Sequence, residues 1–407
     1  MSSLLSLVLR GITSIVRFAF VIVLARVLSP DDVGVYSVFS AALIITTFIV
    51  GLDFYIHTNR EIAASEPQDT ERHLGNTLAL YIAAYALLLP IVAAIAVAFF
   101  VPVELLGYFL LICVLDHLSQ EASRLFFALR LPIAANWVIF FRLASWSLLV
   151  TAIALADSTA VTLNNVFLFW LGGAFVTCLH SARVLHKEGI ALRPFKHLDI
   201  PWLKNGLVVA FPFLVSTVAL RITEYGDRFF IKTWMSDAQL GAYAFYASIA
   251  GVSSMVAYTG VMSLLYPELI RHHKAGDQAA LSTTYRKMCL LSIATIGVTA
   301  ALTTVLVPFI TGLTGKAIYQ QYHDVFYLLI IAYSISGLAL LPHFYLYARS
   351  GDRWIYTSTI AVGLLSLLLN YLLVPRLGLA GAAWAVILSS TVLLIAKGTG
   401  AMRIARA

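Results

Sequence analysis

The sequence predicts an all-α integral membrane protein of twelve transmembrane helices, arranged as two parallel six-helix lobes. Three observations predict this fold: the composition, the number of long apolar runs, and an internal repeat. Of the 407 residues, 60% are hydrophobic and only 12% are charged, whereas about a quarter of the residues of a soluble protein are charged. A chain with so few charges suits a bilayer better than water.

Twelve apolar runs are each long enough to cross a bilayer, which takes about 20 mostly apolar residues. The run 202–230 is the least regular, because it contains Pro212 and a cluster of charges. The first run contains Arg10 and Arg17 and no small-residue cleavage site, so we interpret it as a retained helix and not as a signal peptide. The expected spans are 5–28, 34–56, 75–100, 104–128, 133–156, 163–185, 202–230, 239–265, 286–311, 322–347, 355–374 and 379–401.

The connections between the spans are short. The longest are 57–74, 186–201 and 266–285, and none of them could hold a further domain. The chain therefore divides into an N-terminal lobe, residues 1–190 with spans one to six, and a C-terminal lobe, residues 191–407 with spans seven to twelve.

The distribution of Lys and Arg predicts the orientation in the membrane. Of the 27 Lys and Arg residues, 19 are assigned to the side of the N-terminus, Lys397 among them, and four to the other side. Because basic residues mark cytoplasmic loops, both termini are expected in the cytoplasm. The same bias explains the net charge of +7 without nucleic acid as a partner. The remaining four arginines, which lie inside spans, are Arg17, Arg142, Arg221 and Arg228.

Several classes of site have no signal in the sequence. Cys113, Cys178 and Cys289 lie far apart in apolar runs and form neither a metal-binding spacing nor an obvious disulfide pair. No Gly-rich phosphate loop accompanies a soluble domain, so ATP is not expected as the direct energy source. We expect no metal, no cofactor and no catalytic residue. The absence of any Asn-x-Ser/Thr sequon favours a bacterial or archaeal source.

An internal repeat relates the two halves. The stretch RVLSPDDVGVYSVFSAALI from Arg26 aligns without gaps with TWMSDAQLGAYAFYASIAG from Thr233, which places Gly34 on Gly241. Each stretch lies between the first and second span of its half. FFALR (126–130) and YLYAR (345–349) end the fourth span of each half in the same way. An even number of spans per half gives both halves the same orientation, as in parallel repeats.

These stretches resemble a known family. LARVLSPDDVGVYSVF, after the first span, is similar to the ARxLxPxxxGxY signature of bacterial polysaccharide exporters, and GLDFYIHTNREIA resembles the end of their second span. NYLLVPRLGLAGAAWAVILSS (370–390) resembles their Pro-Gly hairpin between spans eleven and twelve. The signatures describe structure: a tight turn at Gly34 and close helix packing at Gly381.

The resemblance covers the whole chain. It implies the multidrug/oligosaccharidyl-lipid/polysaccharide (MOP) exporter superfamily, whose multidrug members form the MATE family, and within it the O-antigen flippases. Such proteins move undecaprenyl-pyrophosphate-linked oligosaccharides from the cytoplasmic to the periplasmic leaflet of the bacterial inner membrane, for O-antigen, capsule or exopolysaccharide biosynthesis. The implied partners are this lipid-linked oligosaccharide, membrane lipid and the polysaccharide polymerase machinery. A V-shaped protein is expected, with a central cleft lined by spans one, two, seven and eight.

Span four predicts a polar helix face inside the membrane. Asp116, Gln120 and Arg124 follow one another at intervals of four residues and therefore share one side of the helix. A charge at the bilayer centre costs about 3 kcal/mol on insertion scales, so such residues face each other or a polar cavity. Asp116 is a candidate coupling site for a proton or another cation.

Spans four and five predict an ion pair. Glu121 and Arg142 lie at nearly equal distances from the expected turn at Leu131, and hence at similar depth. The pair either holds two neighbouring helices together or serves transport, with Arg142 as a substrate contact and Glu121 as a coupling site. His117, midway along the same span, either is satisfied by a neighbour or joins a proton relay.

The stretch LRITEYGDRFF (220–230) places a second charged cluster on span seven. Arg221, Glu224 and Arg228 follow at i, i+3 and i+7 and predict pairs within the helix, whereas Asp227 lies on another face and needs a partner elsewhere. The cluster is either paired with itself near the outer interface or lines a cleft. In a cleft, the two arginines would contact an anionic substrate and the two carboxylates would act in coupling.

Arg17 is the intramembrane charge with the fewest local partners, since no carboxylate lies within seven positions of it. The repeat alignment places Arg17 opposite Glu224, which predicts a pair across the cleft in the empty protein. An anionic substrate would then compete with Glu224 for Arg17; the alternative is a permanent salt bridge between the lobes. Candidate tyrosines for the sugar are Tyr225, Tyr243, Tyr246 and Tyr258, for each of which ordinary packing is the alternative.

Two other functions compete with the flippase. A cation-coupled multidrug exporter of the same superfamily resembles its relatives in an acidic residue in span one, but span one here has Arg17 and no acid. A membrane polysaccharide polymerase or ligase would present a large outer loop with catalytic residues, and no such loop is expected. We therefore predict a transporter and not an enzyme.

Overall fold

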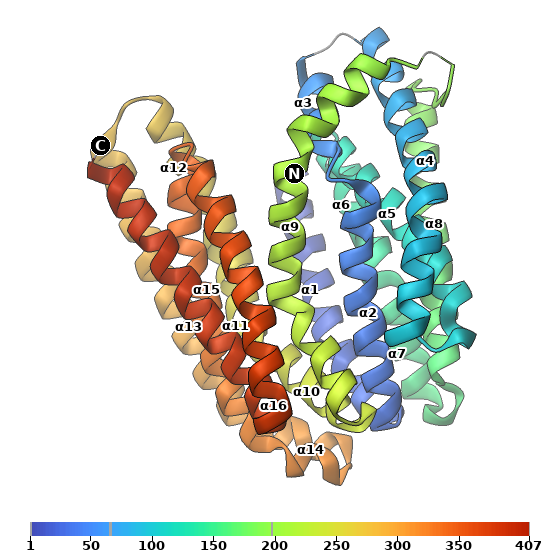
Figure 1. Cartoon of the computed structure of the whole chain (residues 1–407), viewed down its shortest axis with the longest axis vertical. Coiled ribbons are helices and arrows are strands. Elements are labelled where there is room, and N and C mark those ends of the chain that lie inside the picture. The colour runs from blue at the N-terminus through green and yellow to red at the C-terminus, as the bar shows by residue number, and fades with distance from the viewer. Residues whose placement is uncertain (1, 65–66, 197, 407) are drawn as a thin grey trace. The chain divides into compact units, whose positions relative to one another are not determined.

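The computed structural model describes residues 2–64, 67–196 and 198–406. Within these ranges the chain is helical almost throughout and contains no β-strand, as Figure 1 shows. Ten of the described helices are long and apolar enough to cross a membrane. The predicted all-α, multi-pass membrane fold is confirmed.

The elements, in chain order, are α1 (Ser2–Val27), α2 (Pro30–Gly51), α3 (Tyr55–Ala64), α4 (Pro67–Phe99), η1 (Val103–Leu105), α5 (Leu106–Ala128), α6 (Pro132–Phe140), η2 (Phe141–Ser145), α7 (Trp146–Ala156), η3 (Ser158–Ala160), α8 (Leu163–Lys187), α9 (Ile200–Trp234), α10 (Asp237–Ala250), α11 (Val252–Ala257), η4 (Tyr258–Met262), α12 (Ser263–Lys274), α13 (Gln278–Thr314), α14 (Ala317–Gln321), α15 (His323–Ala348) and α16 (Asp352–Arg406). The elements η2 and η4 are single wide π-helical turns inside longer helices. The expected long connection 266–285 is almost entirely helical, because α12 and α13 are separated by only residues 275–277.

The number of crossing helices, twelve, stays a prediction. One of the ten membrane-length helices is α16, although its backbone leaves the helical region at Gly378, where φ is 59° and ψ is −137°. This break lies in the segment where the sequence predicts a hairpin between spans eleven and twelve. A Cβ on Gly381 would lie 2.3 Å from the carbonyl oxygen of Leu373, so the close packing expected at Gly381 is present.

The described helices form two compact units. Unit 1 comprises Met1–Leu28 and Val38–Val218, and unit 2 comprises Ser29–Ser37 and Ala219–Ala407. The 35-residue helix α9 therefore begins in unit 1 and ends in unit 2. The division at residue 190 concerns the two six-span halves of the sequence and stays a prediction.

The repeat is visible in unit 2 as two equivalent helix starts. The Ser29 hydroxyl accepts a hydrogen bond from the backbone N–H of Asp32 at the start of α2, and the Ser236 hydroxyl accepts one from Gln239 at the start of α10. These are N-caps, which satisfy donors that a helix start leaves open. Ser29 and Ser236 are aligned in the sequence repeat, so the repeated sequence produces the same local structure twice.

Gly34 lies within α2, and the tight turn expected there is wrong. Instead, a Cβ on Gly34 would lie 2.0 Å from the carbonyl oxygen of Asp237, and a Cβ on Gly241 would lie 2.1 Å from that of Pro30. Pro30 and Asp237 are themselves aligned in the repeat. The two contacts are therefore reciprocal, and each glycine allows one helix start to approach the other's backbone.

The second span ends at Gly51, five residues before the expected end. Leu52 and Asp53 have positive φ angles of 53° and 46°, which interrupt the helix and separate α2 from α3. Asp53 is only 2% exposed. The short helix α3 packs against α4 and α5, so the sequence from 57 to 64, expected as a connection, is part of unit 1's helical body.

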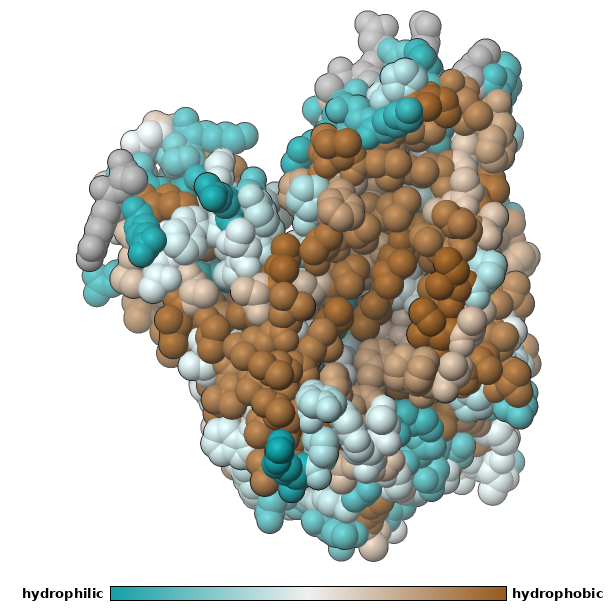
Figure 2. Space-filling model, in the orientation of Figure 1, coloured by the Kyte–Doolittle hydropathy of each residue, from teal (hydrophilic) through white to brown (hydrophobic). Residues whose placement is uncertain are grey.

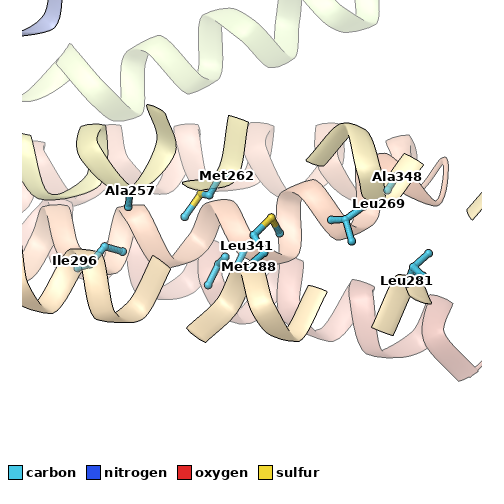
Figure 3. Close-up of a cluster of buried hydrophobic side chains, with 8 residues drawn as sticks. All are labelled: Ala257, Met262, Leu269, Leu281, Met288, Ile296, Leu341 and Ala348. Atoms are coloured by element: carbon cyan, nitrogen blue, oxygen red, sulfur yellow. The ribbon is translucent and has the colours of Figure 1, made fainter. Parts of the chain in front are cut away.

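Unit 2 has an apolar core next to the wide turn between α11 and α12. Met262 at the end of this turn packs with Met288 of α13 and Leu341 of α15, as Figure 3 shows. Methionine is flexible and fills irregular spaces, which suits a place where the helix is locally widened.

The surface of each unit follows the pattern expected in a bilayer. In Figure 2, hydrophobic residues cover the middle of each unit and hydrophilic residues gather at its ends. Large apolar side chains such as Leu87, Val208, Val305 and Leu364 are more than 60% exposed. Exposing so much apolar surface is unfavourable in water but not in contact with lipid tails.

Candidate functional site: intramembrane charges in each unit

The first network joins α5 to the π-helical turn η2 in unit 1. Arg142 donates from Nε to Oδ1 of Asp116 at 2.9 Å and from Nη2 to Oδ2 at 2.7 Å, and also to Oε1 of Gln120 at 3.2 Å. The fork of the guanidinium thus matches both carboxylate oxygens, which is the strongest geometry for this pair. The side chain of Asp116 is 7% exposed and that of Arg142 is 18% exposed.

The predicted pair of Glu121 with Arg142 is wrong. Arg142 contacts Asp116 and Gln120, one helical turn apart on the polar face of α5, whereas Glu121 lies about 100° further round the helix. The prediction compared only the distance of each residue from the turn. The facing of the side chains decides the pairing, and the long arginine side chain spans the difference in depth.

Glu121 has its own set of partners. Its Oε1 accepts from Arg124 at 2.6 Å and its Oε2 accepts from the Tyr81 hydroxyl at 2.6 Å. Arg124 in turn lies over the ring of Tyr55, 3.7 Å from the ring centre. His117 is 1% exposed and is hydrogen-bonded through Nδ1 to the Tyr85 hydroxyl. The charged groups of this region are therefore all bound to partners on α3, α4 and α5.

The second network surrounds Arg228 in unit 2. The side chains of Asp227 and Arg228 are 2% and 9% exposed, and Nη1 of Arg228 lies 3.1 Å from Oδ1 of Asp227. Asp227 accepts a further hydrogen bond from the Tyr243 hydroxyl at 2.6 Å, and Arg228 donates to the Ser37 hydroxyl at 3.1 Å. Tyr243 and the neighbouring Arg228 are thus the partners that Asp227 was expected to need. Arg228 bonds the backbone carbonyl of Glu224 and not its carboxylate.

Arg221 and Glu224 form the more accessible pair of α9. Nη1 of Arg221 lies 2.5 Å from Oε2 of Glu224, as the i, i+3 spacing predicts, and the two side chains are 27% and 40% exposed. A pair with this exposure can exchange partners at lower cost than the pair of Asp227 and Arg228, because the released groups remain within reach of solvent.

The sequence prediction missed one buried cation. Lys397 of α16, counted with the cytoplasmic loops, is 3% exposed, and its Nζ lies 3.2 Å from Nδ1 of His343 on α15. Since an ammonium group only donates, His343 accepts and is neutral in this bond. No carboxylate of the described residues lies within ion-pair distance of Lys397. The signal available in the sequence was the continuation of the apolar helix beyond Lys397.

Arg17 is an exposed residue of α1 in unit 1. Among the described residues of unit 1 it has neither an ion pair nor a hydrogen bond. It lies 15 residues after the start of the 26-residue helix, or about 22 Å along it at 1.5 Å per residue. The predicted pair of Arg17 with Glu224 would join the two units and stays a prediction; within unit 2, Glu224 binds Arg221.

The four candidate tyrosines differ in how much of each side chain is exposed and in which groups it already contacts. Tyr243 and Tyr246 are fully buried and bond Asp227 and the backbone carbonyl of Tyr319, respectively. Tyr225 lies beneath the guanidinium of Arg228, with 4.9 Å between the charge and the ring centre. Tyr258, which is 42% exposed and stacks on Phe344, is the one of the four with a large open surface.

Comparison with known proteins identifies the family. Residues 2–273 match the family profile described as "Polysaccharide biosynthesis protein", which is well over half of the chain. The chain belongs to this polysaccharide biosynthesis family. No curated protein sequence matches the chain.

Solved structures similar to this member of the polysaccharide biosynthesis family are membrane transporters. An inward-facing multidrug resistance MATE family transporter of the MOP superfamily has 14% identity and a TM-score of 0.72, over 97% of this chain and 95% of that one. An outward-facing form of such a transporter gives a TM-score of 0.65 at 14% identity, over 99% and 94%. A MOP superfamily transporter from Pyrococcus furiosus gives 0.62 at 14% identity, also over 99% and 94%, and its description reports a binding pocket of reverse polarity. The fold of this chain is that of MOP superfamily transporters.

Proposed function

We propose that the protein is a flippase that moves an undecaprenyl-pyrophosphate-linked oligosaccharide from the cytoplasmic to the periplasmic leaflet of a bacterial inner membrane. It would work by alternating access, with both termini in the cytoplasm, and supply the machinery that polymerises a surface polysaccharide. The family match and the transporter fold support an exporter role. The single observation that carries the choice of substrate is the excess of positive charge inside unit 2.

That excess follows from the pairing of the charges. Asp227 balances Arg228 and Glu224 balances Arg221, which leaves Lys397 as a further buried cation whose hydrogen-bond acceptor is a neutral histidine. Holding a cation away from water without a carboxylate partner costs free energy. An anionic group that enters near α9 would offset this cost, and a pyrophosphate carries several negative charges.

The Arg221–Glu224 pair offers a place for the anion to bind. The guanidinium of Arg221 has a planar set of donors that fits phosphate oxygens. Once Arg221 binds the pyrophosphate, the carboxylate of Glu224 is released and becomes available to the charge of Lys397 in the same unit. This change of partners would link substrate binding to a rearrangement of the charged groups, with Glu224 and Asp227 as the coupling carboxylates.

A multidrug exporter is the second candidate, because the similar solved structures include multidrug resistance transporters. An organic cation would need a carboxylate that is free to bind it. In the described residues of unit 2, Asp227 is held by Arg228 and Tyr243, and α1 contains Arg17 but no Asp or Glu. The charges favour an anion.

Reconstitution distinguishes the two candidates. Purified protein in proteoliposomes should move a fluorescent polyprenyl-pyrophosphate glycan between leaflets and should not drive the uptake of an organic cation such as ethidium. Transport of the cation, with no movement of the pyrophosphate lipid above that of empty liposomes, would replace the flippase by the multidrug exporter.

A further inference from the structure

Unit 1 has a small cavity near the starts of α4 and α9. Figure 1 shows that these two helices begin at the same end of the unit. The cavity has a volume of about 210 Å³ and lies between the first turns of α4 and the connection from α8 to α9. It lies on the side of the membrane that the Lys and Arg distribution predicts to be cytoplasmic. Figure 2 shows hydrophilic residues gathered at this end of the unit.

The connection is held on α4 by specific hydrogen bonds. The backbone N–H of Ala191 donates to Oε1 of Glu71 at 2.9 Å, and that of Asp199 donates to Oδ1 of Asn76 at 2.7 Å. A Cβ on Gly75 would lie 2.8 Å from the carbonyl oxygen of Arg193, so glycine is needed for the loop to lie this close. These contacts fix the loop that forms one side of the cavity.

The basic side chains around the cavity keep donors that the hydrogen bonds between the loop and α4 do not occupy. Arg193 and Lys196 line it, are exposed, and make no ion pair within the described part of unit 1. Arg72 forms an ion pair from Nη2 to Oδ2 of Asp199 at 2.7 Å, and its side chain is still 53% exposed. Glu71 is the one carboxylate of the lining, and its Oε1 is bonded to the loop. The lining has three cations against one anion.

The loop that closes the cavity also carries exposed apolar residues. Leu192, Phe195, Leu198 and Ile200 are each between 42% and 54% exposed, and Phe195 has the unusual φ of 65° for a non-glycine residue. Apolar side chains interleaved with basic ones are typical of segments that lie in the membrane interface. A cavity beside such a segment would open at the depth of the lipid headgroups.

We propose that this cavity binds the phosphate group of a membrane lipid. Arg193 and Arg72 supply forked donors, Lys196 supplies a point charge, and the exposed apolar residues contact the lipid tails. A volume of about 210 Å³ is smaller than the sites of drug-sized ligands, which take about 300–1,000 Å³, and suits a headgroup. The lipid is either an anionic phospholipid or the pyrophosphate lipid of the proposed function; the phosphate site itself does not depend on that function.

Native mass spectrometry of the full-length protein, exchanged from detergent into neutral phosphatidylcholine nanodiscs, tests the proposal. Phosphatidylglycerol, a polyprenyl pyrophosphate and inorganic pyrophosphate are titrated separately. Retention of either lipid by the wild type should fall at least about tenfold in the double variant Arg193→Gln/Lys196→Gln, because a hydrogen bond to a charged group contributes roughly tenfold or more. Binding of both lipids indicates a general phospholipid site, and binding of the polyprenyl pyrophosphate alone indicates an entry site for the transported lipid.

The matched control is Arg183→Gln/Lys187→Gln, which removes two exposed charges of α8 that do not line the cavity. A second variant, Gly75→Ala, keeps every charge but pushes the loop away and should also lower lipid retention. Equal loss in the control pair, or full retention in both cavity variants, would overturn the proposal. Inorganic pyrophosphate that binds as tightly as the lipids would overturn the assignment of a lipid.

Discussion

The charge cluster around α5 in unit 1 and the one around α9 in unit 2 differ in how completely they are paired. In unit 1, Asp116 holds Arg142 with both oxygens and Glu121 holds Arg124, so the carboxylates and arginines of this region balance. In unit 2, the pairs of α9 are accompanied by Lys397, which has no carboxylate at ion-pair distance among the described residues. Paired charges hold helices together, whereas a buried cation without a carboxylate partner is, in the proposed function, what attracts an anionic substrate.

Removing one partner of the buried ion pair in unit 1 should have the largest effect on the stability of the fold. Asp116→Ala or Arg142→Ala leaves one charge buried without its partner, which costs about 3–5 kcal/mol. Each should strongly lower the folded yield and the midpoint of thermal unfolding in detergent. The double variant Asp116→Leu/Arg142→Leu should recover much of the loss, because neither charge remains.

The control for this prediction is Glu121→Leu/Arg142→Leu, which removes one charge from each of two different pairs. It should be no better than the worse of its two single variants. Recovery in this control, and none in the double variant of Asp116 and Arg142, would reverse the pairing that the structure shows.

In unit 2, a substitution should be able to lower transport without lowering the stability of the fold. Lys397→Met removes a buried cation that has no carboxylate partner, so the unfolding midpoint should stay the same or rise, while transport should fall roughly tenfold, the equivalent of about 1.4 kcal/mol. Arg228→Met should instead lower the folded yield, because Asp227 is left buried and charged. The check is the ratio of transport to folded protein in both variants; similar losses of folded protein would assign Lys397 to structure.

A smaller effect concerns pH and should be confined to unit 1. His57 of α3 is 5% exposed and packs against Trp202 and Gly206 near the start of α9. Burial lowers the pKa of His57, with Arg60 and His73 adding to the shift and Glu61 opposing it. The opened segment binds a proton at about pH 6.5, so this contact is stable above that pH and weakens as the pH falls below it.

Hydrogen exchange measures this effect directly. After correction for intrinsic rates, amides of residues 200–207 should exchange faster at pH 5.5 than at pH 7.5. The variant His57→Phe should reduce the difference, and His57→Phe/His73→Phe should remove it, because His73 stacks on the same Trp202 and burial also lowers its pKa. A pH dependence that persists in full in the double variant would show that another group is responsible.

The sequence predicts most of the fold, because hydrophobic runs of membrane length and repeated caps are local features. Ser29 and Ser236 begin their helices as the repeat indicates, and the break at Gly378 falls in the expected hairpin. The resemblance to the exporter signature implies a tight turn at Gly34, and only the structure shows the approach of Asp237 that requires glycine there.

The candidate site is less predictable, because it depends on contacts between helices. Sequence spacing gives the pair of Arg221 with Glu224 within one helix. It does not give the partner of Arg142, which depends on how α5 and the wide turn η2 face each other. Nor does it give the burial of Lys397, since α16 continues for nine residues beyond it and α15 covers it.

The measurement that tests the central claim most directly is the flipping of a lipid-linked glycan by Arg17→Ala. Arg17 is a mid-helix arginine that no residue of the described part of unit 1 pairs with, so its loss should not weaken the fold. Surface glycan in cells that lack their own flippase is normalised to protein in the membrane. Glycan display should fall about tenfold in Arg17→Ala and recover partly in Arg17→Lys, which keeps the charge without the fork. Both variants should insert normally into the membrane. Full glycan display by Arg17→Ala at wild-type protein levels would contradict the claim that intramembrane cations without a carboxylate partner in their own unit serve to bind the pyrophosphate.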